Sequence, residues 1–169
     1  MKFTFVPEYR YNTFNEVTVD FLKSIGVKGI VLDIDNTLEP YEHPTPGEDV
    51  VSWLDSLREN GISAAFVSNN DKERVELFNA DLHLPAYYKA GKPFKKRIFM
   101  AIKDMGVSPK ETVLMGDQVF TDVWAAHNAG IRAILLPPIN DKRDFLTKFK
   151  RLLEKPILKK YDSKEKTIN

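Results

Sequence analysis

Two aspartates two positions apart, Asp33 and Asp35, are the residues of this chain best placed to do chemistry. They follow the apolar segment 29–32 and precede a turn at Asn36 and Thr37. Side chains two positions apart on a strand point to the same face, so the two carboxylates should converge where the strand ends. Two like charges held close together require a cation, a shared proton or different environments. A divalent metal ion beside a nucleophilic carboxylate meets that requirement, and the pair therefore points to phosphoryl transfer.

Three further polar sites follow apolar segments or precede helices. They are Ser68 with Asn69 and Asn70, Lys92 in a Gly-Lys-Pro loop, and Asp117 with Asp122. Each is weak alone, because a serine after a strand is usually a turn residue, a single lysine is usually solvated, and an aspartate often caps a helix. As a set they gain weight, because a doubly wound sheet binds its ligands at the edge where the carboxyl ends of its strands meet.

Hydrophobic periodicity predicts that helices and strands alternate along the chain. We expect helices near 13–25, 48–60, 70–78, 94–105 and 122–128, and strands near 29–34, 62–67, 112–115 and 131–136. Thr13 is expected to cap the first of these helices and Asn70 the third. Strands separated by helices of this length predict an α/β fold, a doubly wound, mostly parallel sheet of five strands with helices on both faces.

The length suits one domain, which we place at residues 1–155. It should comprise a motif-bearing core at 27–136, an N-terminal helical extension at 1–26 and an amphipathic helix at 141–155. The apolar stripe of that last helix is expected to pack on the domain; it consists of Phe145, Leu146, Phe149, Leu152 and Leu153. A flexible basic tail is expected at 156–169.

The composition excludes several classes of protein. The 169 residues include no cysteine, which excludes disulfides, thiolate catalysis and cysteine-based metal sites. No segment approaches the ~20 apolar residues of a membrane span, and the first residues lack a signal-peptide pattern, so we expect a cytoplasmic protein. Residues 142–169 carry ten Lys and Arg against four Asp and Glu, while the net charge of the chain is only +1. The rest is therefore acidic, and the basic end suits either an anionic membrane surface or a solvated helix face.

In this order and context, the residues described above resemble the haloacid dehalogenase (HAD) superfamily of aspartate-nucleophile phosphatases. Asp33 and Asp35 match its first motif, Ser68 its second, Lys92 its third, and Asp117 with Asp122 its fourth. The fuller pattern, from Asp33-Ile34-Asp35-Asn36-Thr37-Leu38 to Gly116-Asp117-Gln118, is similar to the bacterial YqeG family of subgroup IIIA. This resemblance covers most of the chain.

The resemblance implies a catalytic role for three residues and a metal site. Asp33 would attack phosphorus and form an aspartyl-phosphate, while Asp35 would protonate the leaving oxygen and later accept a proton from water. Asp33, the backbone carbonyl of Asp35 and Asp117 would hold Mg²⁺, and Asp122 would either bind it directly or orient a metal-bound water. Lys92 would neutralise negative charge on Asp33 and on the phosphate.

The substrate would be held by four residues of the same motifs. Thr37, Ser68, Asn69 and Lys92 are assigned to this role, and the Pro-rich loop 39–47 is expected to contribute to specificity. Many relatives carry a cap domain over the site, but the spacing between motifs leaves no room for one here. The site should therefore be open and suit a large phosphorylated substrate.

A lipid head group is the favoured substrate, because YqeG-like sequences are similar to a mitochondrial phosphatase that acts on phosphatidylglycerophosphate. It would require brief contact with an anionic bilayer, at the inner face of the membrane. A phosphoprotein or a polynucleotide end are alternatives, although the acidic body argues against a nucleic-acid partner. A receiver domain and a non-enzymatic scaffold are rivals from other classes, and the oligomeric state is left open.

Overall fold

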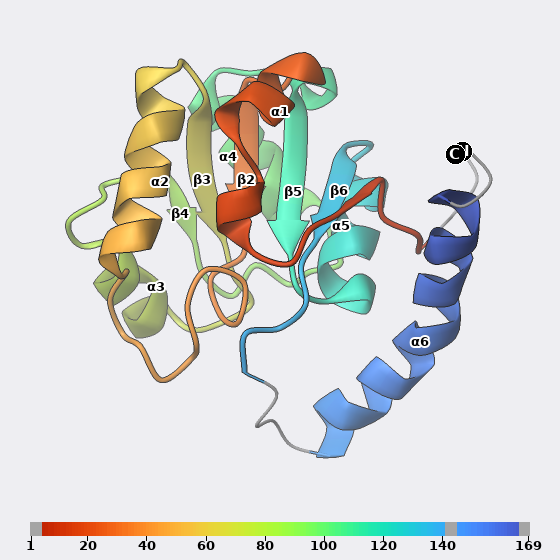
Figure 1. Ribbon diagram of the computed structural model, residues 1–169. Helices are drawn as coiled ribbons and strands as arrows, with labels where there is room; N and C mark the ends of the chain where they lie inside the picture. The colour runs from red at the N-terminus through yellow and green to blue at the C-terminus, as the bar shows by residue number, and fades with distance from the viewer. Residues whose placement is uncertain (1–4, 141–144, 166–169) are drawn as a thin grey trace.

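A parallel sheet forms the centre of the protein, whose computed structural model describes residues 5–140 and 145–165 (Figure 1). Its strands lie in the order β1-β6-β5-β2-β3-β4 and every neighbouring pair is parallel. The strands are β1 (Tyr9–Arg10), β2 (Gly29–Leu32), β3 (Ser63–Val67), β4 (Ala86–Tyr87), β5 (Thr112–Gly116) and β6 (Arg132–Leu135). The described residues thus form six strands rather than the predicted five. Four of them match the ranges predicted from the sequence, whereas β1 and β4 are too short to show alternation and were not placed.

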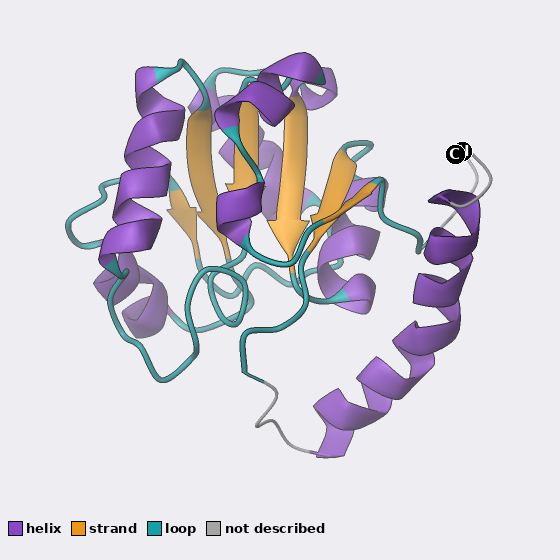
Figure 2. Ribbon diagram, in the orientation of Figure 1, coloured by secondary structure: helices purple, strands orange, loops and turns teal. Residues whose placement is uncertain are grey.

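Helices cover both faces of the sheet, as predicted for a doubly wound α/β fold (Figure 2). The α-helices are α1 (Val19–Ser24), α2 (Glu48–Glu59), α3 (Lys72–Asn79), α4 (Lys96–Met105), α5 (Trp124–Asn128) and α6 (Phe145–Glu165). Short 3-10 helices occupy Phe14–Glu16 and Pro109–Glu111, and a π-helix occupies Val119–Val123. Helices α1, α2 and α3 pack on one face, and α4 and α5 pack on the other.

Successive side chains of the central strands point alternately into the two hydrophobic layers on either face of the sheet. In β2, Ile30 and Leu32 face α1 to α3, whereas Val31 faces α4 and α5. All of β2 is buried, as expected for a central parallel strand. Leu32 lies in register with Phe66 of β3 and Met115 of β5, so the three central strands end at one edge of the sheet. The residues that follow them are therefore brought together.

Two of the predicted helix starts, those of the first and third helices, are wrong in detail. The helix expected at 13–25 is divided, because Thr18 caps α1 by accepting a hydrogen bond from the Phe21 amide at 3.1 Å. Thr13 makes no such bond. The cap expected for the third helix, Asn70, is replaced by Asp71, whose carboxylate accepts from the Arg74 amide at 3.0 Å. The Asn70 side chain turns toward the site instead.

Helix α6 is longer than the amphipathic helix predicted at 141–155. Its expected first residues, 141–144, lie outside the described residues, and it continues through Pro156 to Glu165, where a flexible tail was expected. A proline inside a helix removes one backbone hydrogen bond. Here Ile157 and Leu158, just beyond it, pack against the α4–α5 side of the core and compensate for that loss.

The side of α6 that packs on the domain also differs from the predicted apolar stripe. Leu152 and Leu153, two members of that stripe, are 57% and 48% exposed. Near the far end of the helix, Asp162 forms an ion pair with Arg10 at 2.7 Å. None of the helices in the described residues is both long enough and apolar enough to span a bilayer.

Candidate active site

The loops at the carboxyl edge of the sheet surround a cavity of about 420 Å³. Asp33 follows β2, Ser68 follows β3, and Lys92 precedes α4. The cavity is lined by Asp33, Asp35, Tyr41, Ser68, Asn69, Asn70, Lys92, Gln118 and Thr121. Five of the residues predicted from the sequence to catalyse or to bind substrate therefore line one cavity, and only Thr37 does not.

Three carboxylates gather beside this cavity. Asp33, Asp117 and Asp122 each offer an oxygen, and these oxygens all lie within 4.8 Å of one another. All three residues are buried. Buried carboxylates repel one another unless a cation compensates their charge. The arrangement can hold a divalent metal ion of the kind that prefers oxygen ligands.

Lys92 lies between two of these carboxylates. Its Nζ is 2.9 Å from Asp33 Oδ1 and 2.6 Å from Asp122 Oδ1, and its side chain is only 2% exposed. Burial alone would lower the pKa of Lys92, but Asp122 and Asp33 outweigh it and raise the pKa above its usual value. The lysine is therefore charged, yet it supplies one positive charge against three carboxylates.

Asn69 fixes the backbone of Lys92. Its side-chain oxygen accepts from the Lys92 amide at 2.7 Å, and its side-chain nitrogen donates to the Lys92 carbonyl at 3.2 Å. Two loops that are 23 residues apart in the sequence are joined in this way. Asn69 thus holds Lys92 in addition to lining the cavity.

The pKa of Asp33 is shifted strongly from its usual value. Burial raises its pKa to about 7, the negative charges of Asp122 and Asp117 add to that rise, and Lys92 opposes it. A metal ion bound by the same carboxylates would favour the ionised form of Asp33, as Lys92 does. The ionised form is the one that can act as a nucleophile.

The position of Asp122 depends on a π-helix and on a glycine. Asp122 lies within the π-helix Val119–Val123, and its Oδ2 accepts from the Gln118 amide at 3.0 Å. A Cβ atom on Gly116 would come within 2.3 Å of the Asp122 carboxyl carbon, so this approach is open only to glycine. Wide helical turns of this kind are frequent at functional sites.

Glu154 connects α6 to the same loop. Its side chain is buried, and its Oε1 accepts from the Val119 amide at 3.0 Å, at the first residue of the π-helix. Sequence reasoning missed Glu154 because it placed this helix as an amphipathic extension. The one available signal is an acidic residue within a basic segment.

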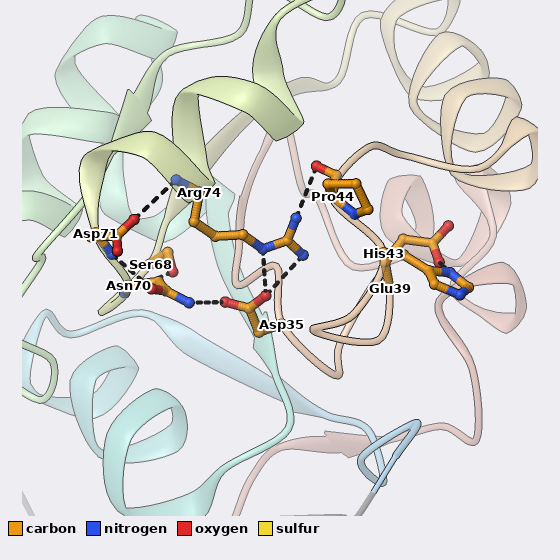
Figure 3. Close-up of polar contacts among 8 residues, drawn as sticks. All are labelled: Asp35, Glu39, His43, Pro44, Ser68, Asn70, Asp71 and Arg74. Carbon is orange, nitrogen blue, oxygen red and sulfur yellow. Dashed lines mark hydrogen bonds and ion pairs between the residues drawn. The ribbon is translucent and has the colours of Figure 1, made fainter.

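Arg74 is a second residue that sequence reasoning missed. Its guanidinium group contacts Asp35, and Asn70 contacts the same carboxylate from the other side (Figure 3). Arg74 lies on a helix and 39 residues from Asp35 in the sequence, so no local pattern marks it.

Thr37 does not contribute to the cavity wall, although it was predicted to bind substrate. It is buried, and its hydroxyl group donates to Asp117 Oδ1 at 3.4 Å. The tight turn after Asp35 directs the side chain inward, where it contacts a carboxylate of the metal cluster. Ser68, by contrast, lines the cavity as predicted.

A larger cavity, of about 580 Å³, lies at the opposite end of the sheet, near the start of β3. Three aspartates are part of its wall: Asp55, Asp81 and Asp104. The wall also includes Arg58, which pairs with Asp55 at 2.8 Å, so the aspartates leave a net negative charge there that does not suit a phosphorylated substrate.

Comparison with known proteins agrees with this geometry. A model of the family described as haloacid dehalogenase-like hydrolase matches residues 11–136. The Probable phosphatase YqeG of Bacillus subtilis is 37% identical over 157 residues, which are 93% of this chain and 91% of that protein. Both matches include all of the motif residues.

Two solved structures share the fold at low sequence identity. CbbY from Rhodobacter sphaeroides, in complex with phosphate, is 13% identical with a TM-score of 0.56, over 70% of this chain and 90% of that chain. The cobalt-bound deoxy-D-mannose-octulosonate 8-phosphate phosphatase from Haemophilus influenzae is 19% identical with a TM-score of 0.50, over 57% of this chain and 61% of that chain. The family model and the near full-length relative, together with this fold, show that the chain belongs to the haloacid dehalogenase-like hydrolases, as a phosphatase of the YqeG type.

Proposed function

We propose that this phosphatase is a Mg²⁺-dependent phosphomonoester hydrolase that forms an aspartyl-phosphate on Asp33. The observation that carries the proposal is the position of Asp33: it lines the open cavity, lies 2.9 Å from Lys92, and shares a buried cluster with Asp117 and Asp122. A carboxylate in this position has access to a substrate and to two sources of positive charge.

The donor set suits Mg²⁺. Asp33, Asp117 and Asp122 supply only carboxylate oxygens, and the backbone carbonyl of Asp35 would add a fourth oxygen. Small hard cations prefer such ligands and retain water beside them. When bound, Mg²⁺ would neutralise negative charge on the phosphoryl group and on the carboxylates.

The protein side chains would carry out the remaining steps. Asp33 attacks phosphorus, the bond to the leaving oxygen breaks, and Asp35 gives that oxygen a proton. Asp35 then accepts a proton from the water that hydrolyses the aspartyl-phosphate. Lys92 holds Asp33 and offsets the charge of the phosphoryl group, while the Ser68 hydroxyl donates a hydrogen bond to a phosphoryl oxygen.

The open cavity supports a large substrate. Within the described residues, the segment between Asp35 and Ser68 holds only the loop 39–47, α2 and β3, and the segment between Ser68 and Lys92 holds α3 and β4. Neither contains a cap domain. Tyr41 is part of the cavity wall and is 55% exposed, so an aromatic ring is available beside a bound substrate.

Phosphatidylglycerophosphate is the substrate that we propose. Exposed Leu152 and Leu153 lie on the basic helix α6, a combination that suits brief contact with an anionic bilayer. The protein would then act peripherally, at the inner face of the membrane.

The test is Mg²⁺-dependent phosphate release from phosphatidylglycerophosphate in mixed micelles. It runs beside p-nitrophenyl phosphate, a phosphopeptide and a 3′-phosphorylated oligonucleotide, with Asp33→Asn as the inactive control. Release from the lipid that far exceeds the others supports the full proposal. Release from p-nitrophenyl phosphate alone supports the phosphatase chemistry but excludes phosphatidylglycerophosphate as the substrate. No Mg²⁺-dependent release from any ester contradicts the proposed function and favours a phosphate-binding scaffold.

A further inference from the structure

The carboxylate of Asp35 has a different set of contacts on each of its two oxygens (Figure 3). Nε and Nη2 of Arg74 both lie 2.9 Å from Oδ1. Oδ2 accepts one hydrogen bond, from Asn70 Nδ2, also at 2.9 Å. Nε donates a hydrogen bond to Oδ1, whereas the Nη2 contact is an ion pair without a hydrogen bond, so the positive charge of the guanidinium lies beside Oδ1. Oδ2 instead accepts from the neutral side-chain amide of Asn70, and a proton is favoured on the oxygen farther from a cation, so Oδ2 is the oxygen suited to exchange a proton with a leaving group.

The Arg74 guanidinium also contacts the loop that faces the substrate. Nη1 donates to the carbonyl of Pro44 at 2.9 Å, and the guanidinium carbon lies 5.8 Å from the centre of the exposed Tyr41 ring. It also lies 5.3 Å from the centre of the Phe78 ring. The side chain is only 8% exposed. One buried group therefore contacts Asp35 and two residues of the loop 39–47.

The loop itself is closed by hydrogen bonds within it. Glu39 Oε1 accepts from the Gly47 amide at 2.8 Å, and the His43 amide donates to the Pro40 carbonyl at 3.0 Å. The Pro44 carbonyl that Arg74 contacts lies between these two bonds. A shift of the closed loop would therefore move the Arg74 guanidinium and, through it, change the orientation of the Asp35 carboxylate.

We propose that Arg74 is a positioning residue for Asp35: it holds Oδ1, leaves Oδ2 for the leaving group, and ties this orientation to the loop 39–47. A substrate that binds correctly against the loop would therefore have its leaving oxygen next to Oδ2 of Asp35. Lysine cannot replace arginine here, because its single ammonium group cannot reach Asp35 and Pro44 with the same planar geometry. This inference rests on the proposed function, since it concerns the residue that protonates the leaving group.

Leaving groups of different basicity test the first part. p-Nitrophenolate departs readily without a proton, whereas an alkoxide requires one. We therefore expect Arg74→Gln and Arg74→Lys to lower kcat for glycerol 1-phosphate about tenfold to hundredfold more than kcat for p-nitrophenyl phosphate, as general acid catalysis contributes about 10²–10⁴. Equal losses on both esters would show a merely structural role and would overturn the proposal.

Arg132 offers a matched control. Its guanidinium group is partly buried and donates to the carbonyls of Ile25 at 2.9 Å and Lys110 at 3.3 Å, at the other end of the sheet. Arg132→Gln and Arg132→Lys remove comparable bonds without touching the site. They should leave the ratio of the two kcat values unchanged, and circular dichroism would show which of the four variants fold.

Hydrogen exchange tests the second part and does not depend on activity. The amides of His43 and Gly47 should exchange at least several-fold faster in Arg74→Lys than in the unaltered protein, with no change in Arg132→Lys. Unchanged exchange rates in Arg74→Lys would contradict the proposal that Arg74 connects Asp35 to the loop 39–47. If the unaltered protein hydrolyses neither ester, the proposed function fails, and with it the catalytic role of Asp35. The exchange rates would still show whether Arg74 stabilises the loop 39–47.

Discussion

Gly116 and Asp122 approach so closely that a Cβ atom on Gly116 would lie 2.3 Å from the Asp122 carboxyl carbon. Gly116→Ala should therefore displace the Asp122 carboxylate from the three-carboxylate cluster. We expect metal affinity to fall at least tenfold, with a loss of stability of about 1–3 kcal/mol from overpacking. Calorimetric titration with Mg²⁺ and urea unfolding would measure the two effects.

Gly29→Ala is the matched control for that substitution. Its Cβ would meet Val107 Cγ2 at 2.6 Å, at the opposite end of β2. It should therefore destabilise the protein without a change in metal affinity. Equal metal affinity in Gly116→Ala and Gly29→Ala would contradict the role assigned to the Gly116–Asp122 contact.

Lys92→Met should nearly abolish activity while the protein remains folded. Methionine keeps most of the length of the side chain but removes the charge that lies 2.9 Å from Asp33. Loss of one preorganised hydrogen-bond donor that stabilises a developing negative charge typically costs about 10²–10³ in kcat, and we expect a loss of at least this size for a charged donor. Steady-state hydrolysis of p-nitrophenyl phosphate would measure the loss. Lys96→Met, which alters an exposed lysine at the start of α4, should keep full activity, and a similar loss in both variants would refute this prediction.

The raised pKa of Asp33 predicts how stability and metal affinity depend on pH. Without metal, the folded protein keeps a proton on Asp33 up to about pH 7, whereas an unperturbed aspartate loses it near 3.8. The folded state then binds more protons than the unfolded state within this window, so the stabilisation from this group is complete below it and is lost as the pH rises to about 7. Mg²⁺ binds the ionised carboxylate, so its affinity should increase over the same window.

Urea unfolding with EDTA and with Mg²⁺, between pH 4 and 8, would test this dependence. Asp33→Asn is the reference, because it removes the titrating group and leaves the other carboxylates in place. The difference in the free energy of unfolding between the unaltered protein and Asp33→Asn should shrink with rising pH in EDTA and grow with rising pH in Mg²⁺. A difference that is independent of pH would show that Asp33 does not bind the proton.

The residues that could be found from the sequence are those that follow a central strand. Asp33, Ser68 and Asp117 each come directly after an apolar segment, and parallel register alone brings such positions to one edge. Lys92 could be found because its loop directly precedes a helix. The presence of two further short strands, β1 and β4, could not be found, since two residues show no periodicity.

Arg74 and Glu154 could not be predicted because their roles depend on how helices pack. Arg74 reaches Asp35 only when α3 lies against the loop 39–47, and Glu154 reaches Val119 only when α6 lies beside the π-helix. The close approach of Gly116 to Asp122, within the π-helix, is likewise a contact between separate segments. These are tertiary contacts, and a local pattern contains no signal for them.

Glu154 therefore provides a further prediction, which concerns a contact from outside the catalytic loops. Glu154→Ala would leave the buried Val119 amide without its acceptor, at a cost of about 1–3 kcal/mol. Because Val119 begins the turn that carries Asp122, metal affinity should fall as well. Glu154→Gln keeps a carbonyl oxygen near the amide and should retain most of both properties.

Urea unfolding and Mg²⁺ titration of the two Glu154 variants would separate this role from a general effect of α6. Lys155→Ala alters the adjacent, exposed residue of the same helix and should change neither quantity. If Glu154→Ala loses stability but binds Mg²⁺ as tightly as Lys155→Ala, Glu154 anchors the helix and does not position the metal loop. If both quantities fall together and Glu154→Gln restores them, the hydrogen bond to Val119 transmits the position of α6 to Asp122.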